Sequence, residues 1–300
     1  MQEHDVGAKM HSGEVDISDE LVRELLTSQF PEFGDLPVQA VEATGTVNAL
    51  YRLGDDMCVR LPRLREGAAH LEKELEWLPK LAPHLSLAVP EPVAAGHPER
   101  GYPFPWAIYR WIEGEPYVVD RIRDERRAGA DLAQFVSELR RIDPSGAPRS
   151  GRPPLLELDS MTRAAIDSVR DIVDTDATTA AWDTALEAPV WDGRPVWRHC
   201  DLLTPNLLVE EGRLKAVIDF GGVGVGDPAL DVIPAWSVFG GGGRASFRDP
   251  LDVDDGTWAR ARGFALHQAL LIIPYYPDTN PGFVTTATRT VQEVLADLNV

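Results

Sequence analysis

Apolar residues follow helical spacing in some stretches of this chain and strand-like spacing in others. Ser18 precedes apolar residues at helical intervals, which predicts a capped helix ending near Phe30-Pro31: Leu21, Val22, Leu25 and Leu26. The same spacing predicts helices over about 66–81, 131–143 and 158–174. The Gly240–Gly243 run is interpreted as a flexible connector that leads into a mainly helical C-terminal segment.

The pattern between these helices predicts short strands. The runs VQAVEA, ALYRL and MCVRLP are separated by turn-rich residues, as in an antiparallel meander, and VPEPVAAG and WAIYRWIEG predict two further strands. Later, LLVEEG and RLKAVIDF predict a hairpin after the strand PVWRH. A β-rich first part and a mainly helical second part indicate an α+β fold.

A break at Glu113-Gly114-Glu115-Pro116 indicates the boundary between two lobes. We expect an N-terminal lobe over 1–112, with 1–17 loosely ordered, and a C-terminal lobe over 113–300.

The formal net charge of −19 excludes nucleic acid as a partner, because an acidic surface repels phosphate backbones. The charge is explained either by a solubilising surface or by attraction of a cationic ligand. Two cysteines without a C-x-x-C spacing indicate free thiols in the reducing cytoplasm. The N-terminus does not look like a signal peptide, and the apolar run ALLIIP is too short to span a membrane.

The sharpest chemical signal is a pair of motifs in the second half of the chain. His199-Cys200-Asp201 and Asn206 have the form H-x-D-x-x-x-x-N, and Asp219-Phe220-Gly221 follows as D-F-G. Both elements are kinase signatures. The predicted hairpin between them would return Asp219 to the loop that carries Asp201 and Asn206. His199 is expected to brace this loop. The competing interpretation is that the motifs arise by chance and their acids only cap turns.

These residue types suit phosphoryl transfer on physical grounds. Mg²⁺ neutralises the charge on nucleotide phosphates and prefers oxygen ligands, which Asp219 and the amide of Asn206 can supply. The remaining carboxylate, that of Asp201, can orient an acceptor hydroxyl and receive its proton.

Five stretches resemble the aminoglycoside phosphotransferase family, and the likeness extends over nearly the whole chain from about residue 19: HCDLLTPNLLV, VIDFGGVGVGDPALD, GTVNALYRL, CVRLPR and LHQALLIIPYY. The resemblance implies a protein-kinase-like bilobal fold and Mg-ATP or Mg-GTP as phosphate donor. It gives Asp201 the catalytic-base role, with Asn206 and Asp219 binding magnesium. Cys200 stands where the family commonly has Gly and Leu203 where many relatives have His, which puts the acceptor preference in question more than the chemistry.

The first lobe carries candidates for binding the nucleotide. Arg60 occupies the strand position at which kinases have a phosphate-binding Lys, and Glu74 is its expected partner, with Glu72 as the alternative. The alternative interpretation is that Arg60 is an ordinary charged residue on the surface of the strand. The Thr44–Asn48 loop would cover phosphates, although an ordinary hairpin turn explains it as well. By resemblance, backbone groups of Arg110 and Ile112 would contact the nucleobase.

Several polar residues remain open to two interpretations. Asp227 is expected to cap a helix that begins at Pro228, and Asp231 either braces the catalytic loop or faces the acceptor. A cluster near the C-terminus either lines the acceptor pocket or belongs to the core and a loop: Tyr275, Tyr276, Asp278 and Asn280.

The sequence therefore predicts an enzyme that phosphorylates a hydroxyl of a small molecule, an aminoglycoside-like compound or an amino alcohol. A macrolide is the nearest alternative acceptor. A protein kinase is disfavoured because no A-P-E motif follows Asp219. A non-catalytic nucleotide-binding pseudokinase is the rival from another class, and a metal-dependent hydrolase is disfavoured because no histidine cluster accompanies the acids.

Overall fold

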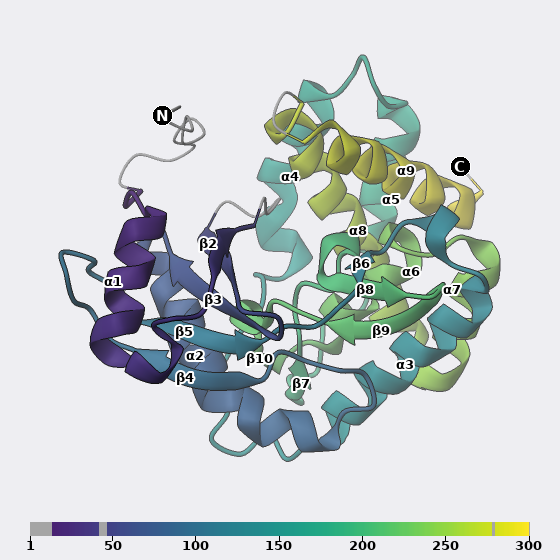
Figure 1. Ribbon diagram of the computed structural model, residues 1–300. Coiled ribbons are helices and arrows are strands. Elements are labelled where there is room, and N and C mark those ends of the chain that lie inside the picture. The colour runs from purple at the N-terminus through teal and green to yellow at the C-terminus, as the bar shows by residue number, and fades with distance from the viewer. Residues whose placement is uncertain (1–13, 42–46, 278–279, 300) are drawn as a thin grey trace. The chain divides into compact units, whose positions relative to one another are not determined.

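The computed structural model describes residues 14–41, 47–277 and 280–299. These residues belong to two compact units, one made of 1–80 with 90–112 and the other of 81–89 with 113–300. The first is built on an antiparallel sheet and the second is mainly helical (Figure 1). The predicted α+β class is confirmed.

The first unit contains a five-stranded antiparallel sheet in the order β1-β2-β3-β5-β4. Its strands are β1 Val38–Ala40, β2 Asn48–Leu53, β3 Met57–Pro62, β4 Pro92–Gly96 and β5 Trp106–Arg110. Helix α1 (Asp19–Gln29) precedes the sheet, and α2 (Arg65–Leu81) follows β3. The Ser18 hydroxyl accepts a hydrogen bond from the Leu21 N–H, so the predicted cap of α1 is present.

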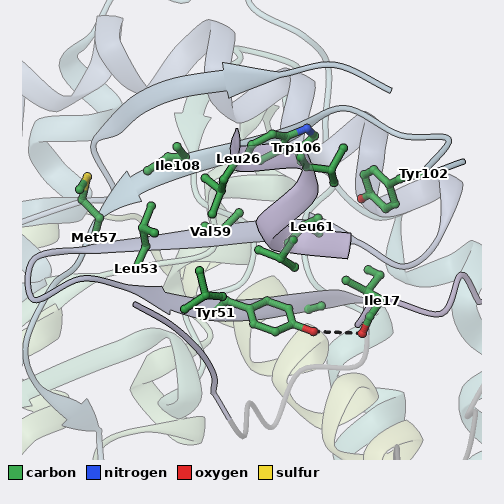
Figure 2. Close-up of a cluster of buried hydrophobic side chains, with 14 residues drawn as sticks. Ile17, Leu26, Tyr51, Leu53, Met57, Val59, Leu61, Tyr102, Trp106 and Ile108 are labelled. Carbon is green, nitrogen blue, oxygen red and sulfur yellow. Dashed lines mark hydrogen bonds between the residues drawn. The ribbon is translucent and has the colours of Figure 1, made fainter. Parts of the chain in front are cut away.

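One face of this sheet packs against α1 (Figure 2). The buried cluster joins Leu26 of α1 to Val59 and Leu61 of β3 and to Trp106 and Ile108 of β5. Successive strand residues point to opposite faces. Cys58, Arg60 and Tyr109 therefore lie on the other face, which separates the polar chemistry of this unit from its α1-side core.

The second unit contains most of the helices (Figure 1) and two small sheets. Its α-helices are α3 Glu125–Arg141, α4 Asp159–Ser168, α5 Thr175–Leu186, α6 Pro234–Ser237, α7 Gly241–Leu251, α8 Asp255–Tyr275 and α9 Pro281–Leu298. Strands β6 Glu115–Pro116, β8 Leu207–Glu210 and β9 Arg213–Val217 form one sheet. Strands β7 Val196–Arg198 and β10 Gly224–Gly226 pair antiparallel as the other.

Residues 81–89 belong with the second unit, although the sequence placed them in the first lobe. The Ala88 N–H donates to the Lys215 carbonyl at 3.1 Å, and the Ala88 carbonyl accepts from the Val217 N–H at 2.9 Å. These two bonds make Ala88 a parallel β-bridge partner of Ala216 in β9. Backbone pairing of this kind is not encoded in the local composition, which explains why the boundary was drawn differently.

Two local predictions were wrong. The helix expected over 158–174 ends at Ser168, and a separate helix, α5, begins at Thr175 with Asp174 as its cap. The Gly240–Gly243 run is not a connector, because α7 begins at Gly241.

Close packing of α3 on α7 accounts for Gly129 of α3. A Cβ atom added to Gly129 of α3 would lie 2.5 Å from the Gly243 carbonyl oxygen of α7. The two backbones therefore approach as only glycine allows. No helix in the described part of the chain combines the length and the apolar character needed to cross a bilayer.

We expect Gly129→Ala to lower the free energy of unfolding by about 1–3 kcal/mol, since the new methyl group has to displace the α7 backbone. Gly241→Ala is the matched control, because nothing lies within 4 Å of its added Cβ. That variant should be neutral or slightly more stable. Thermal denaturation measures both, and equal melting temperatures would contradict the close-packing account.

Candidate active site

The H-x-D-x-x-x-x-N segment links β7 to β8, and Asp219 lies two residues after the end of β9. The β8–β9 hairpin returns the chain to the start of β8, where the Ile218 N–H donates to the Asn206 carbonyl at 2.9 Å. Strand β10 then pairs with β7 and closes the segment on itself. The hairpin thus brings the two motifs together, as the sequence predicted.

Asp231 holds the backbone that precedes Asp201. Its side chain is fully buried, with one carboxylate oxygen accepting the His199 N–H at 2.7 Å and the other the Cys200 N–H at 2.8 Å. Cys200 has a positive φ of 75°, a conformation that side chains rarely adopt. Of the two roles left open by the sequence, Asp231 has the bracing one.

His199 supports the loop from inside. Its fully buried ring accepts the Asp201 N–H at Nδ1 (3.2 Å) and lies 3.0 Å from the Ile218 carbonyl through Nε2. Because Nδ1 acts as an acceptor, Nε2 is the donor to Ile218. The ring also packs against Phe220 with centroids 4.6 Å apart. His199 therefore ties the two motifs together, which is the bracing role predicted for it.

Asn206 orients the Asp201 carboxylate. Its Nδ2 donates to the Asp201 carbonyl at 2.9 Å and to the carboxylate Oδ2 at 2.8 Å. Burial raises the pKa of Asp201 above its ordinary value, and the charge of Asp219 adds to this effect. Interactions with His199, Asn206 and Arg152 act on this pKa in the opposite direction. The hydrogen bond from Asn206 thus fixes the Asp201 carboxylate in one orientation.

The donor set suits magnesium. Since the Asn206 amide nitrogen is directed at Asp201, its Oδ1 atom remains as a ligand, and Asp219 adds a carboxylate held at a left-handed backbone position (φ 65°). Among the described residues, no group of three or more His, Cys, Asp or Glu side chains could hold a metal. Two oxygen donors without a full protein cage match Mg²⁺, which usually keeps waters and phosphates as further ligands.

A segment that the sequence reasoning treated only as a loop packs on both motifs. The Ser150 hydroxyl donates to the Gly222 carbonyl at 2.5 Å and lies 3.5 Å from the Cys200 sulfur. Ser150 also pairs through its backbone with Val225 of β10. No signal in the Pro-, Gly- and Arg-rich sequence of 143–154 indicated this contact.

In the first unit, Arg60 and Glu74 form an ion pair. The Arg60 Nη1 atom lies 2.6 Å from Glu74 Oε2, and the Glu74 side chain is fully buried. The Tyr109 hydroxyl donates to the same oxygen at 3.1 Å. With its amide oxygen facing Arg60, Asn48 accepts from Nε at 3.2 Å and from Nη2 at 3.0 Å. The structure thus pairs Arg60 with Glu74 and not with Glu72, and adds Tyr109 and Asn48, which the sequence did not indicate.

The other residues predicted to bind nucleotide have less distinctive surroundings. The Arg110 N–H donates to the Glu91 carbonyl at 2.9 Å, and its side chain pairs with Asp56 at 2.6 Å. Arg110 can therefore offer a nucleobase only its carbonyl. Ile112 is half-buried at the end of the first unit. Thr44 lies outside the described residues.

The sequence left several polar residues open to either a structural role or a role in binding the acceptor, and the structure gives most of them a structural contact. Asp227 accepts the Ala229 N–H as a cap of a 3-10 turn, not of an α-helix, and pairs with Arg260 at 2.8 Å. Asn280 caps α9 by accepting the Phe283 N–H. Tyr275 is exposed and Tyr276 packs on Phe283, whereas Asp278 lies outside the described residues.

A mainly apolar hollow lies beside the catalytic loop. Leu203 and Thr204 line it together with residues of α8 and α9 that include Gln268, Ile272, Phe283 and Thr286. Leu203 is one of the two positions at which the resemblance noted in the sequence indicates a departure from the pattern of relatives. Its side chain contributes apolar surface to this hollow.

A family model described as "Phosphotransferase enzyme family" matches residues 42–264, which include both motifs. No curated protein sequence matches the chain significantly.

Solved structures of similar fold cover nearly the whole chain. The GDP and kanamycin complex of APH(2")-IIIa is 20% identical with a TM-score of 0.70, covering 92% of this chain and 98% of that one. ADP-bound APH(2'')-Ib is 18% identical with a TM-score of 0.60, covering 92% and 98%. The macrolide 2'-phosphotransferase MphH from Brachybacterium faecium is 21% identical with a TM-score of 0.59, covering 89% and 97%. The predicted kinase-like fold is confirmed.

We expect Asp231→Asn to lower the free energy of unfolding by about 1–3 kcal/mol, because an amide has one accepting oxygen and leaves a buried N–H unpaired. Asp249→Asn makes the same chemical change at an exposed position and should leave the melting temperature unchanged. A stable Asp231→Asn protein would show that the loop does not depend on this carboxylate.

Proposed function

This chain belongs to the phosphotransferase enzyme family, and we propose that it transfers the terminal phosphate of Mg-ATP or Mg-GTP to a hydroxyl of a small molecule. The observation that carries the proposal is the arrangement of Asp201, Asn206 and Asp219. It combines one oriented carboxylate with two oxygen donors suited to magnesium. A pseudokinase has no need of a complete set of this kind.

In this mechanism Asp201 acts on the acceptor. Its carboxylate, fixed by the Asn206 amide, accepts the hydrogen bond of the attacking hydroxyl and takes its proton as the bond to phosphorus forms. Asn206 Oδ1 and the Asp219 carboxylate would hold Mg²⁺, which neutralises charge on the phosphates. Asp231 and His199 keep the loop in the geometry that aims Asp201.

Arg60 is the proposed phosphate anchor of the donor nucleotide. Glu74 and Asn48 hold the Arg60 guanidinium in one orientation, and its planar, permanently charged group suits contact with phosphate oxygens. Backbone groups of Arg110 and Ile112, and Thr44 in the loop before β2, are proposed to complete the nucleotide site. One similar structure contains GDP and another contains ADP, so we propose a purine nucleotide without choosing between the two.

The acceptor is proposed to be an aminoglycoside-like compound or an amino alcohol. The net charge of −19 favours cationic compounds through long-range attraction, and a similar structure contains kanamycin. A macrolide is the second candidate, because a similar structure is a macrolide 2'-phosphotransferase, and the binding of such a compound would depend on apolar burial. Neither Cys58 nor Cys200 forms a disulfide, which fits our proposal of a cytoplasmic enzyme.

Asp201→Asn is expected to lower turnover by roughly 10²–10⁴-fold, because the amide cannot take the hydroxyl proton. The wild-type protein is first incubated with Mg-ATP or Mg-GTP and a panel of aminoglycosides, amino alcohols and macrolides, with nucleotide consumption as the readout. The variant is then assayed on the accepted compound. Asp176→Asn, at an exposed position, is the control. Nucleotide affinity should be unchanged in both variants, and full activity of Asp201→Asn would refute the role of this carboxylate.

Asp219→Ala should raise the Mg²⁺ concentration needed for nucleotide binding and for turnover, since one carboxylate ligand is removed. Asp252→Ala is a matched control, because Asp252 is also an aspartate with positive φ (48°) and lies far along the chain from both motifs. Titration of Mg²⁺ against nucleotide binding distinguishes them. An unchanged metal requirement in Asp219→Ala would mean that this residue is only structural.

A further inference from the structure

Arg152 is a buried cation that the mechanism above does not use. It lies two residues after Ser150, whose side chain contacts Gly222 and Cys200. The Ser150 carbonyl also accepts from the buried Arg198 guanidinium. These bonds fix the segment that carries Arg152 against the two loops that carry Asp201 and Asp219.

The described residues around Arg152 do not supply a hydrogen-bond acceptor for every donor of its side chain. Its Nη1 atom is fully buried and has no hydrogen-bond partner in the described part of the chain. No ion pair to a described carboxylate neutralises it, whereas the buried Arg260 pairs closely with Asp227. Burial lowers the pKa of Arg152, and the nearby Asp201 acts in the opposite direction. A guanidinium keeps its charge in proteins, so this group is a desolvated cation with an unused donor.

A buried donor without a partner costs about 1–3 kcal/mol, and a ligand that accepts its hydrogen bond offsets this cost. The group next to Asp201 that carries negative charge during the reaction is the phosphoryl group in transfer, whose charge is spread over three oxygens. Donors already oriented toward such charge, in a place shielded from water, stabilise a transition state strongly.

We propose that Arg152 is a catalytic residue whose Nη1–H binds an oxygen of the phosphoryl group as it passes from the nucleotide to the acceptor. This inference rests on the proposed function. The bond between the acceptor oxygen and phosphorus forms while the bond between phosphorus and the bridging oxygen of the nucleotide breaks. The acceptor proton goes to Asp201, the electron pair of the broken bond leaves with the nucleoside diphosphate, and Arg152 exchanges no proton.

The same geometry argues against contact between Arg152 and an amine of the acceptor. Two cations close together in a site of low polarity repel each other, so an ammonium group would be disfavoured at this point. A cationic acceptor would have to place its amines away from Arg152. The phosphoryl group, in contrast, is present in every turnover, whichever acceptor is used.

The test uses aluminium fluoride, which with Mg-ADP mimics the phosphoryl group in transfer and needs no acceptor. We expect Arg152→Ala to bind Mg-ADP within about twofold of wild type but to weaken the fluoroaluminate complex by roughly 10²-fold, less than the largest effects of such arginines. The affinity of Arg152→Lys for the fluoroaluminate complex should be intermediate, because lysine keeps the positive charge but lacks the planar array of N–H donors. Arg149→Ala is the control, since it removes an exposed arginine from the same segment.

Four outcomes decide the proposal. A selective loss of the fluoroaluminate complex in Arg152→Ala, or an intermediate loss in Arg152→Lys if the alanine variant does not fold, supports it. Complexes as tight as in wild type overturn it, even if the acceptor KM rises. Equal losses of Mg-ADP and of fluoroaluminate binding also overturn it, since they indicate a structural role. If the wild-type protein binds only Mg-GDP, that nucleotide replaces Mg-ADP throughout, whereas failure to bind either one would refute the proposed function, and this inference with it.

Discussion

The buried carboxylate of Asp231 is the interaction on which the candidate site depends. It accepts both His199 and Cys200 N–H groups and so holds Cys200 in a left-handed conformation. That turn directs Asp201 toward Asn206, and the His199 ring connects the same loop to the strand that ends at Asp219. A single buried carboxylate that accepts two backbone N–H groups thus sets the direction of the chain just before Asp201. Loss of either bond would release a strained segment in a site that requires fixed geometry.

The parts of the fold that the sequence predicted are those determined by local pattern. Ser18 caps α1 because its hydroxyl reaches an N–H three residues away, and the hairpin after Asn206 follows from two short apolar runs and a turn. The pairing of Arg60 with Glu74 was also predictable, since strand alternation and helix spacing place both on the inner side of their elements.

What the sequence did not predict depends on contacts between distant residues. The Gly240–Gly243 run has the composition of a linker, yet α7 begins at Gly241 and its Gly243 backbone lies against Gly129 of α3. Residues 81–89 join β9 by backbone bonds that carry no side-chain signature. Ser150 and Arg152 lie in a stretch whose composition indicates only a loop, yet the Ser150 hydroxyl contacts Cys200 and Gly222, which follow 50 and 72 residues later in the chain. Tertiary packing, which local propensity does not encode, determined each of these features.

A metal-bound structure tests the proposed roles of Asp201, Asn206 and Asp219 most directly. The measurement is the crystal structure of the protein with a non-hydrolysable nucleotide and Mn²⁺, whose anomalous signal locates the ion. We predict the signal beside the Asp219 carboxylate and Asn206 Oδ1, with phosphate oxygens completing the coordination, and Asp201 not bound to the ion. A metal held by other side chains, or a nucleotide bound away from Asp219, would contradict the account.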